Sequence, residues 1–365
     1  MIVMKNKIGW KREDILRLSL YRKLSLREQK YIIEKYDSYS NFLQNPPEWF
    51  ESKYNGIFKN DETTRIDFED LLEKLEKENI KYITYYDDNY PELLREIYYA
   101  PMILYYKGQI SNGLNSIAIV GTRRNTLYGK ITTEKIVEEL VKNQIIVVSG
   151  LAYGIDSIAH RETLKNKGIT YAIIASGIDE ISPAISRDLA NKIIDSGGAV
   201  ISEYPPGTKA RPGYFPQRNR IISGVSQAVI VVESDIKGGA LITASFAIDQ
   251  SRELFAVPGP INSSKSAGCN KLIHDSQATA VLSAESILLD LGLISSIQYK
   301  ENREEILFDD KIQKIIYEEI SSEPMHIDTI AEKVNIDVPT LLVKLLELEF
   351  KGLARQLPGK YFIKN

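Results

Sequence analysis

The sequence predicts an α/β protein with a mostly parallel sheet, a small helical domain before the sheet and a winged helix after it. Two observations carry this prediction. Short apolar runs alternate with helical segments in residues 79–293, which is typical of a parallel sheet covered on both faces. Residues 311–365 contain three short helical patterns and a hairpin pattern, which together are typical of a winged helix.

Residues 1–78 carry apolar side chains at helical spacing and predict a small helical domain. The pattern is clearest in 26–43 and 68–80, and Asn45-Pro46-Pro47 interrupts the chain between them. This region contains no constellation of reactive side chains. We therefore expect the chemistry of the protein to lie elsewhere.

Residues 79–293 are predicted to form the sheet domain. The expected buried strands are the continuous apolar, β-branched runs at 116–121, 145–150, 171–176, 199–202, 228–233 and 254–259. Helical stretches such as 132–143 and 155–166 lie between them. Ligands of such folds bind at the carboxyl ends of the strands, where several of these runs end in Gly or Ser.

The last part of the chain is predicted to be a linker, 294–310, followed by a winged helix, 311–365. Its hairpin is expected to turn at Pro358-Gly359. Winged helices commonly bind DNA through the third helix. In that helix, however, Glu347 offsets Lys344, and most of the remaining residues are aliphatic. A structural or protein-contact role is therefore favoured over DNA binding.

The composition is that of a soluble globular protein. The chain has 365 residues, of which 43% are hydrophobic and 26% charged, and a formal net charge of −3. No apolar run approaches the length of a membrane span, and Cys269 is the single cysteine. We expect a cytoplasmic protein with no membrane partner, in which any contact with nucleic acid is confined to a local patch.

One such patch is the stretch between Tyr204 and Val232, which contains no acidic residue. Ahead of the predicted strand 228–233, this stretch contains four cations and three aromatic residues: Lys209, Arg211, Arg218, Arg220, Tyr204, Tyr214 and Phe215. Cations that follow phosphates, beside rings that stack on bases, are what single-stranded nucleic acid requires of a protein. The alternative is a solvated loop whose arginines pair with acids elsewhere in the fold.

Two turns at predicted strand ends have the residues of an anion site. The first is Gly121-Thr122-Arg123-Arg124, and the second is Lys237-Gly238-Gly239. Glycine permits close approach of a phosphate, and a helix that starts after the turn offers free N–H groups. The alternative for each turn is a tight connection that needs glycine only for its backbone shape.

Motifs of several enzyme classes are absent from the sequence. It contains no GxxxxGK followed by Ser or Thr, no HExxH, no paired cysteines and no GxSxG. A dinucleotide fingerprint is also incomplete, because only Gly121 of its glycines is present. His160 is expected to be packed or hydrogen-bonded rather than catalytic. We predict no catalytic residue, no metal and no cofactor.

The ordered motifs resemble those of the DNA processing protein A family, DprA, also called Smf. The resemblance is carried by IAIVGTRRNTLYG (117–129), VVSGLAYGIDSIAH (147–160), FPQRNRIISGVS (215–226), GGALITA (238–244) and FAVPG (255–259). It implies an extended Rossmann-like domain preceded by a small helical, SAM-like domain and followed by a winged helix. It also implies a non-enzymatic protein that binds and protects incoming single-stranded DNA and loads a RecA-type recombinase during natural transformation. Single-strand binding protein and a second copy of the chain, as a homodimer, are the other implied partners.

The resemblance also places the DNA contacts. It gives Arg123 a phosphate contact, makes Phe215 or Tyr214 the base-stacking ring, and makes Arg218 a phosphate or loop-bracing group. The complete predicted DNA-binding set is Gly121, Thr122, Arg123, Arg124, Lys209, Arg211, Tyr214, Phe215, Arg218, Asn219, Arg220, Lys237, Gly238 and Gly239.

Two departures from related patterns bear on function. Many relatives carry Lys where this chain has Pro212, so Arg211 and Lys209 are the basic residues nearest to that position. The competing hypothesis is a nucleotide-binding enzyme of the related phosphoribohydrolase class, whose members carry PGGxGTxxE. The glycine turn here lacks both the preceding Pro and the following Glu of that motif. A protein-interaction scaffold built around the winged helix is a third option, but it does not explain the cations and glycines at the strand ends.

Overall fold

The computed structural model describes residues 9–21, 24–50, 68–111, 115–294, 308 and 310–364. The chain forms two compact units, Met1–Ser295 and Ser296–Asn365. Most of the predicted linker, 294–310, lies outside the described residues. The predicted boundary at residue 78 falls inside the first compact unit, and a separate helical domain there stays a prediction.

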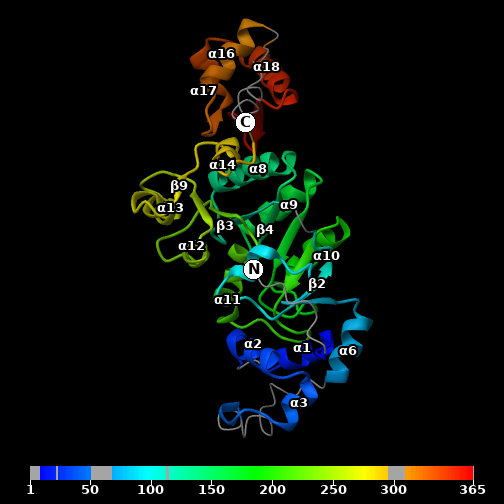
Figure 1. Ribbon diagram of the computed structural model, residues 1–365. Coiled ribbons are helices and arrows are strands. Elements are labelled where there is room, and N and C mark those ends of the chain that lie inside the picture. The colour runs from blue at the N-terminus through cyan, green and yellow to red at the C-terminus, as the bar shows by residue number, and fades with distance from the viewer. Residues whose placement is uncertain are drawn as a thin grey trace. The chain divides into compact units, whose positions relative to one another are not determined.

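The first unit contains a nine-stranded sheet with the order β1-β2-β6-β5-β4-β3-β7-β8-β9 (Figure 1). The strands are β1 Lys81–Thr84, β2 Ile103–Gly108, β3 Ser116–Val120, β4 Ile146–Ser149, β5 Thr170–Ile173, β6 Ala199–Ser202, β7 Ala228–Val231, β8 Glu253–Ala256 and β9 Thr279–Ala280. Every pairing from β6 across to β9 is parallel, whereas β2 pairs antiparallel with β6 and β1 antiparallel with β2. The predicted mostly parallel, Rossmann-like sheet is confirmed.

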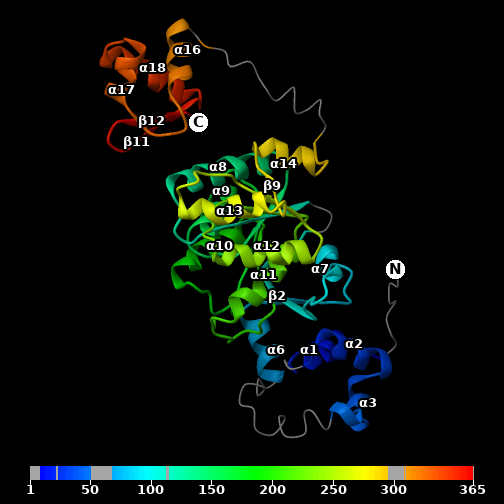
Figure 2. The ribbon, with the colours of Figure 1, turned by 90° about the vertical axis from the view of Figure 1, so that its left-hand side faces the viewer.

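Successive residues of the central strands face opposite sides of the sheet and enter two different cores. In β5, Ile173 belongs to one core and Ala172 to the other. The first core also contains residues of α11 (Tyr214–Gly224), α12 (Gly239–Asp249) and α13 (Ser264–His274), which Figure 2 shows over one face of the sheet. The continuous apolar character of the predicted strands follows from this burial on both faces.

The second core joins the other face of the sheet to the N-terminal helices. These helices are α1 Arg12–Ser19, α2 Leu26–Lys35, α3 Tyr39–Gln44 and α6 Phe68–Lys77. Leu16, Ile32 and Leu71 from them are in the same buried cluster as Val200 of β6. The predicted helical stretch 26–43 is two helices because the Ser38 hydroxyl accepts a hydrogen bond from the backbone N–H of Asn41 (3.1 Å) and starts a new helix.

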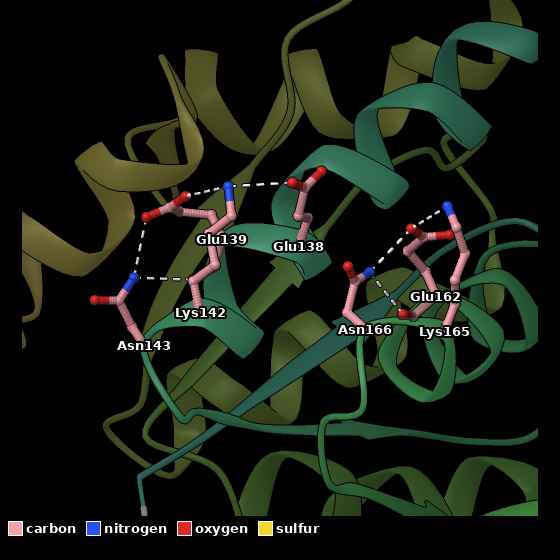
Figure 3. A network of polar contacts seen from close by, with 7 residues as sticks. All are labelled: Glu138, Glu139, Lys142, Asn143, Glu162, Lys165 and Asn166. Carbon is pink, nitrogen blue, oxygen red and sulfur yellow. Dashed lines mark hydrogen bonds and ion pairs between the residues drawn. The ribbon is translucent and has the colours of Figure 1, made fainter. Parts of the chain in front are cut away.

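Two helices next to the sheet, α8 (Leu127–Lys142) and α9 (Ile155–Lys165), end in the same way (Figure 3). After α8, the side-chain amide of Asn143 donates to the carbonyl of Glu139 (2.9 Å), and Lys142 pairs with the Glu139 carboxylate (3.7 Å). The sequence Glu-x-x-Lys-Asn recurs at the end of α9, in Glu162, Lys165 and Asn166. In both helices the Asn amide adds a second hydrogen bond to the carbonyl four residues earlier, and the Lys places a positive charge at the negative end of the helix dipole. The C-terminal ends of the predicted helical stretches, 143 and 166, each lie one residue beyond the end of the helix.

Among the described residues of the first unit, the other α-helices are α7 Glu92–Glu96, α10 Arg187–Asp195 and α14 Ala284–Asp290, and a short 3-10 helix spans Ala184–Ser186. The second unit contains α16 Lys311–Glu319, β10 Met325–His326, α17 Ile327–Val334, α18 Val338–Phe350, β11 Ala354–Leu357 and β12 Tyr361–Lys364. Its sheet has the order β10-β12-β11, and Ile316, Leu345 and Phe362 are among its fully buried core residues. The predicted winged helix is confirmed, with β10 as a strand that the sequence pattern did not reveal.

Candidate nucleic-acid interface

The site lies where the order of the parallel strands reverses. From β3 the chain proceeds through β4, β5 and β6 in one direction, and then returns to add β7, β8 and β9 on the other side of β3. The loops after β3 and β7 therefore diverge, and a crevice opens at the carboxyl ends of these two strands. The two loops are joined at their start: the N–H of Thr122, after β3, donates to the carbonyl of Glu233, after β7 (2.8 Å).

A cavity of about 710 Å³ occupies this crevice. We call it the cleft. Its lining includes nine residues of the predicted DNA-binding set: Gly121, Thr122, Arg123, Arg124, Phe215, Arg218, Asn219, Gly238 and Gly239. These residues come from three segments that are far apart in the sequence, and the fold brings them to one place.

Two glycines of the cleft are required by close packing. A Cβ atom at Gly121 would lie 2.5 Å from the Ile155 side chain, and a Cβ at Gly238 would lie 2.2 Å from the Ser234 hydroxyl oxygen. Gly239 differs, since a Cβ there would meet nothing within 4 Å. The backbone at Gly239 is therefore open to a ligand, and it is also the first residue of α12.

The start of α12 is an anion-accepting helix terminus. Gly238 is its N-cap residue and supplies no side-chain cap, and the first turn contains no acidic residue. The first N–H groups of a helix have no partner within the helix and carry its positive dipole end. A phosphate that enters the cleft meets these groups without displacing a capping side chain.

The side chains of Arg123 and Phe215 form a cation–π contact in the lining of the cleft. Both line it, and the guanidinium carbon of Arg123 lies 5.4 Å from the centroid of the Phe215 ring. Arg123 and its neighbour Arg124 are exposed, whereas Phe215 is partly buried at the start of α11. This arrangement places an exposed cation and an aromatic ring in contact with each other at one wall of the cleft, the two groups that a phosphate and a base would engage.

Arg218 is the buried member of the basic segment, with only 4% of its surface exposed. Its Nη1 donates to the carbonyls of Gly150 (2.7 Å) and Ile173, at the ends of β4 and β5. Burial lowers the pKa of Arg218 to about 10, although the negative charge of Asp156 acts to raise it. The Asp156 carboxylate in turn accepts from the Gly150 N–H (3.1 Å), and burial raises its pKa. Of the two roles considered for Arg218, these contacts favour loop bracing over a phosphate contact.

Five residues of the predicted set do not line the cleft: Lys209, Arg211, Tyr214, Arg220 and Lys237. Tyr214 stacks on Tyr204, with ring centroids 4.3 Å apart, and Arg220 forms an ion pair with Glu203. For Arg220, the structure therefore shows the second of the two hypotheses for this stretch, in which an arginine pairs with an acid of the fold and not with a phosphate. Lys209, Arg211 and Lys237 are exposed.

Sequence reasoning missed an ion pair in the cleft. Lys265 and Asp235 both line it, and the Lys265 ammonium lies 2.8 Å from the Asp235 carboxylate. The pair lowers the pKa of Asp235 through its hydrogen bond to Lys265. Lys265 comes from the start of α13, which no motif connects with the cleft. No signal in the sequence pointed to it, because only the folded chain brings the two residues together.

His160 is a structural residue, as the sequence predicted. It is fully buried, and its Nδ1 lies 2.7 Å from the Thr170 hydroxyl oxygen. Burial lowers the pKa of His160 to about 3, so the ring is neutral at physiological pH. Across the described parts of the chain, no three His, Cys, Asp or Glu side chains are grouped to hold a metal ion. Nor does any helix there combine the length and apolar character that a membrane crossing needs.

Comparison with known proteins identifies the family to which the chain belongs. The family model "DNA recombination-mediator protein A" matches residues 81–292, and the model "DprA winged helix domain" matches residues 307–360. The chain belongs to the DprA/Smf family. The first match spans the sheet and all three segments of the cleft, and the second spans most of the winged helix.

Individual members of the family are similar over most of their length. Protein Smf of Synechocystis sp. is 35% identical over 79% of this chain and 81% of its own. The X-ray structure of DNA processing protein A from Streptococcus pneumoniae is 33% identical, with a TM-score of 0.59 over 78% of this chain and 94% of that one. DNA processing protein A from Helicobacter pylori, whose structure is described as having a unique single-stranded DNA binding mode, is 30% identical. Its TM-score is 0.53 over 58% of this chain and 95% of that one.

Proposed function

We propose that this DprA family protein binds single-stranded DNA in the cleft, without marked sequence preference and without catalysing a reaction. The observation that carries the proposal is the convergence of Arg123, Arg124, Phe215 and the uncapped start of α12 on one cavity at the switch point of the sheet. Cations and free N–H groups bind phosphates of any sequence, and a ring stacks on any base. The single-stranded DNA binding described for the H. pylori relative supports the same role.

The finer role proposed is that of a mediator of recombination. The protein would protect incoming single-stranded DNA, load a RecA-type recombinase on it during natural transformation, and contact single-strand binding protein while doing so. Membership of a family described as a DNA recombination mediator supports this. A homodimer and a cytoplasmic location belong to the same proposal.

We propose a protein-contact role for the winged helix. On α18, the Lys344 ammonium is engaged by the Glu347 carboxylate (2.8 Å) and the Asp310 carboxylate (2.8 Å). Leu346 and Phe350 on the same helix are exposed, Phe350 to 91%. A helix whose lysine is neutralised and whose exposed side chains include large apolar ones suits a protein surface better than a phosphate backbone.

The phosphoribohydrolase alternative needs a carboxylate free to act on a nucleotide. The carboxylates nearest to the cleft are engaged. Asp156 is held by backbone N–H groups, Asp235 pairs with Lys265, and Glu233 is buried and accepts hydrogen bonds from the backbone and side chain of Thr126. These contacts support the binding protein over the hydrolase.

The test is a fluorescence anisotropy titration of a labelled poly-dT oligonucleotide with the purified protein at several salt concentrations. Binding that weakens steeply with salt is expected, together with poor competition by a duplex of equal length and by free nucleotides. Absence of binding to the single strand, together with turnover of a nucleoside monophosphate, would replace the proposal with the hydrolase.

A further inference from the structure

A second cavity lies on the opposite side of α11 from the cleft. It has a volume of about 350 Å³ and is contained in the first unit. We call it the tyrosine cavity because four tyrosines contribute to its walls: Tyr99, Tyr105, Tyr204 and Tyr214. Its size lies within the range of small-ligand pockets.

The helix α11 divides the predicted DNA-binding segment between the two cavities. Phe215, Arg218 and Asn219 line the cleft, whereas Tyr214, Gln217 and Arg220 line the tyrosine cavity. The second set is spaced by three residues, which places it along one side of a helix. A stretch that is a single basic and aromatic patch in the sequence therefore contributes to two separate sites.

The tyrosine cavity contains polar atoms that the protein leaves without partners. Gln29 of α2 is only 7% exposed, and its Nε2 donates to the Leu24 carbonyl (3.0 Å), which fixes the orientation of the amide. Its Oε1 is buried and has no hydrogen-bond partner in the structure. Arg220 binds Glu203 through Nη2, while its buried Nη1 also has no partner. Buried polar groups of this kind are normally satisfied, so the wall of the cavity contains one acceptor and one donor that have no partner within the protein.

The walls of the tyrosine cavity suit a flat ligand. Tyr204 and Tyr214 are stacked with an interplanar angle of 21°. Tyr99 is 62% exposed although it lines the cavity, as expected for a residue at its opening. A flat ring whose edge carries both a donor and an acceptor is the chemistry of a nucleobase.

We propose that the tyrosine cavity binds one base of the DNA strand whose phosphates lie in the cleft; this inference rests on the proposed function. The two cavities are separated by one helix, about 10–12 Å in diameter. At the rise of about 3.4 Å per nucleotide in B-form DNA, about three nucleotides span that distance, and a more extended strand needs fewer. Lys209 and Arg211 are exposed on the loop between β6 and α11, and they supply cations along this route. Arg211 lies 6.0 Å from the ring of Tyr214.

The first experiment maps photochemical cross-links from a poly-dT oligonucleotide that contains 4-thiothymidine, using the full-length protein and mass spectrometry. Cross-links are expected at Tyr99, Tyr204 or Tyr214, in addition to those at Phe215 in the cleft. Cross-links confined to the cleft would overturn the inference and leave the proposed function intact. Failure of the oligonucleotide to bind at all would overturn both, so the two failures are distinguishable.

Adjacent tyrosines provide a matched pair of variants for the second experiment. Tyr98 and Tyr99 are both exposed, but only Tyr99 lines the tyrosine cavity. Tyr99→Ala is expected to weaken binding of poly-dT about fivefold, the lower end of the effect of losing one stacked base. Tyr98→Ala, which removes only an edge contact with the Tyr99 ring, is expected to have a smaller effect. Gln29→Met, which keeps the size of the side chain but removes the acceptor, is expected to reduce the cross-links at Tyr204 and Tyr214. Equal affinities of the two tyrosine variants would contradict the proposal.

Discussion

Substitution of Arg123 by Ala tests the phosphate site of the cleft most specifically. Arg123 is exposed and lies 5.4 Å from the Phe215 ring, so its guanidinium is free to reach a phosphate and its loss leaves the core unchanged. Each phosphate neutralised on a single strand contributes about −0.7 to the slope of log K against log salt concentration. We expect Arg123→Ala to flatten that slope by about 0.7 to 1, for every DNA sequence alike.

The assay is the anisotropy titration repeated between low and physiological salt for the wild type, Arg123→Ala and Arg161→Ala. Arg161 is an exposed arginine of α9 that does not line the cleft, so its removal changes the net charge equally without removing a contact. The wild type and Arg161→Ala are expected to share one slope. An equal loss of slope in both variants would show that Arg123 acts only through net charge and would refute the assignment.

Three further predictions concern the ring, the brace and the buried histidine. Phe215→Ala is expected to lower the affinity for poly-dT by about 1–3 kcal/mol with little change in salt slope, and normal binding with a lower melting temperature would make the ring a core residue. Arg218→Met is expected to destabilise the fold by about 1–3 kcal/mol in urea unfolding, because it leaves the buried carbonyls of Gly150 and Ile173 without their side-chain donor. An unchanged urea midpoint would remove the bracing role. Because the folded pKa of His160 lies at about 3, below the ordinary value of 6.5, only the unfolded chain gains its proton as the pH falls below 6.5. The free energy of unfolding of the wild type should therefore drop by up to about 1.4 kcal/mol per pH unit between pH 6 and 4. If the urea midpoint of His160→Asn fell as steeply with pH as that of the wild type, this explanation would be contradicted.

The central strands were predictable because burial on both faces leaves a direct trace in the sequence. Strands such as β3 and β7 are continuous apolar runs, and their order along the chain with intervening helices permits little besides a parallel sheet. The antiparallel edge strands β1 and β2 were not predicted. Their sequences, KYIT and ILYYKG, are rich in tyrosine and lysine. Only the pairing of β2 with β6, and of β1 with β2, reveals them as part of the sheet.

The cleft was predictable to the extent that it is made of loops at strand ends. Gly121 and Gly238 follow β3 and β7, and the neighbouring position of these two strands brings them together. Two features were not accessible from the sequence. Lys265 reaches the cleft only through tertiary packing of α13, and the helical rotation of α11 turns Arg220 away from the cleft while Arg218 becomes a buried brace.

Amide hydrogen exchange with and without bound poly-dT tests whether single-stranded DNA lies in the cleft at the switch point. Slower exchange on binding is expected at residues 121–126, at the start of α11 and at the first turn of α12, with α18 of the winged helix unchanged. Protection confined to α18 and the β11–β12 hairpin, with the cleft segments unchanged, would contradict this location of the DNA.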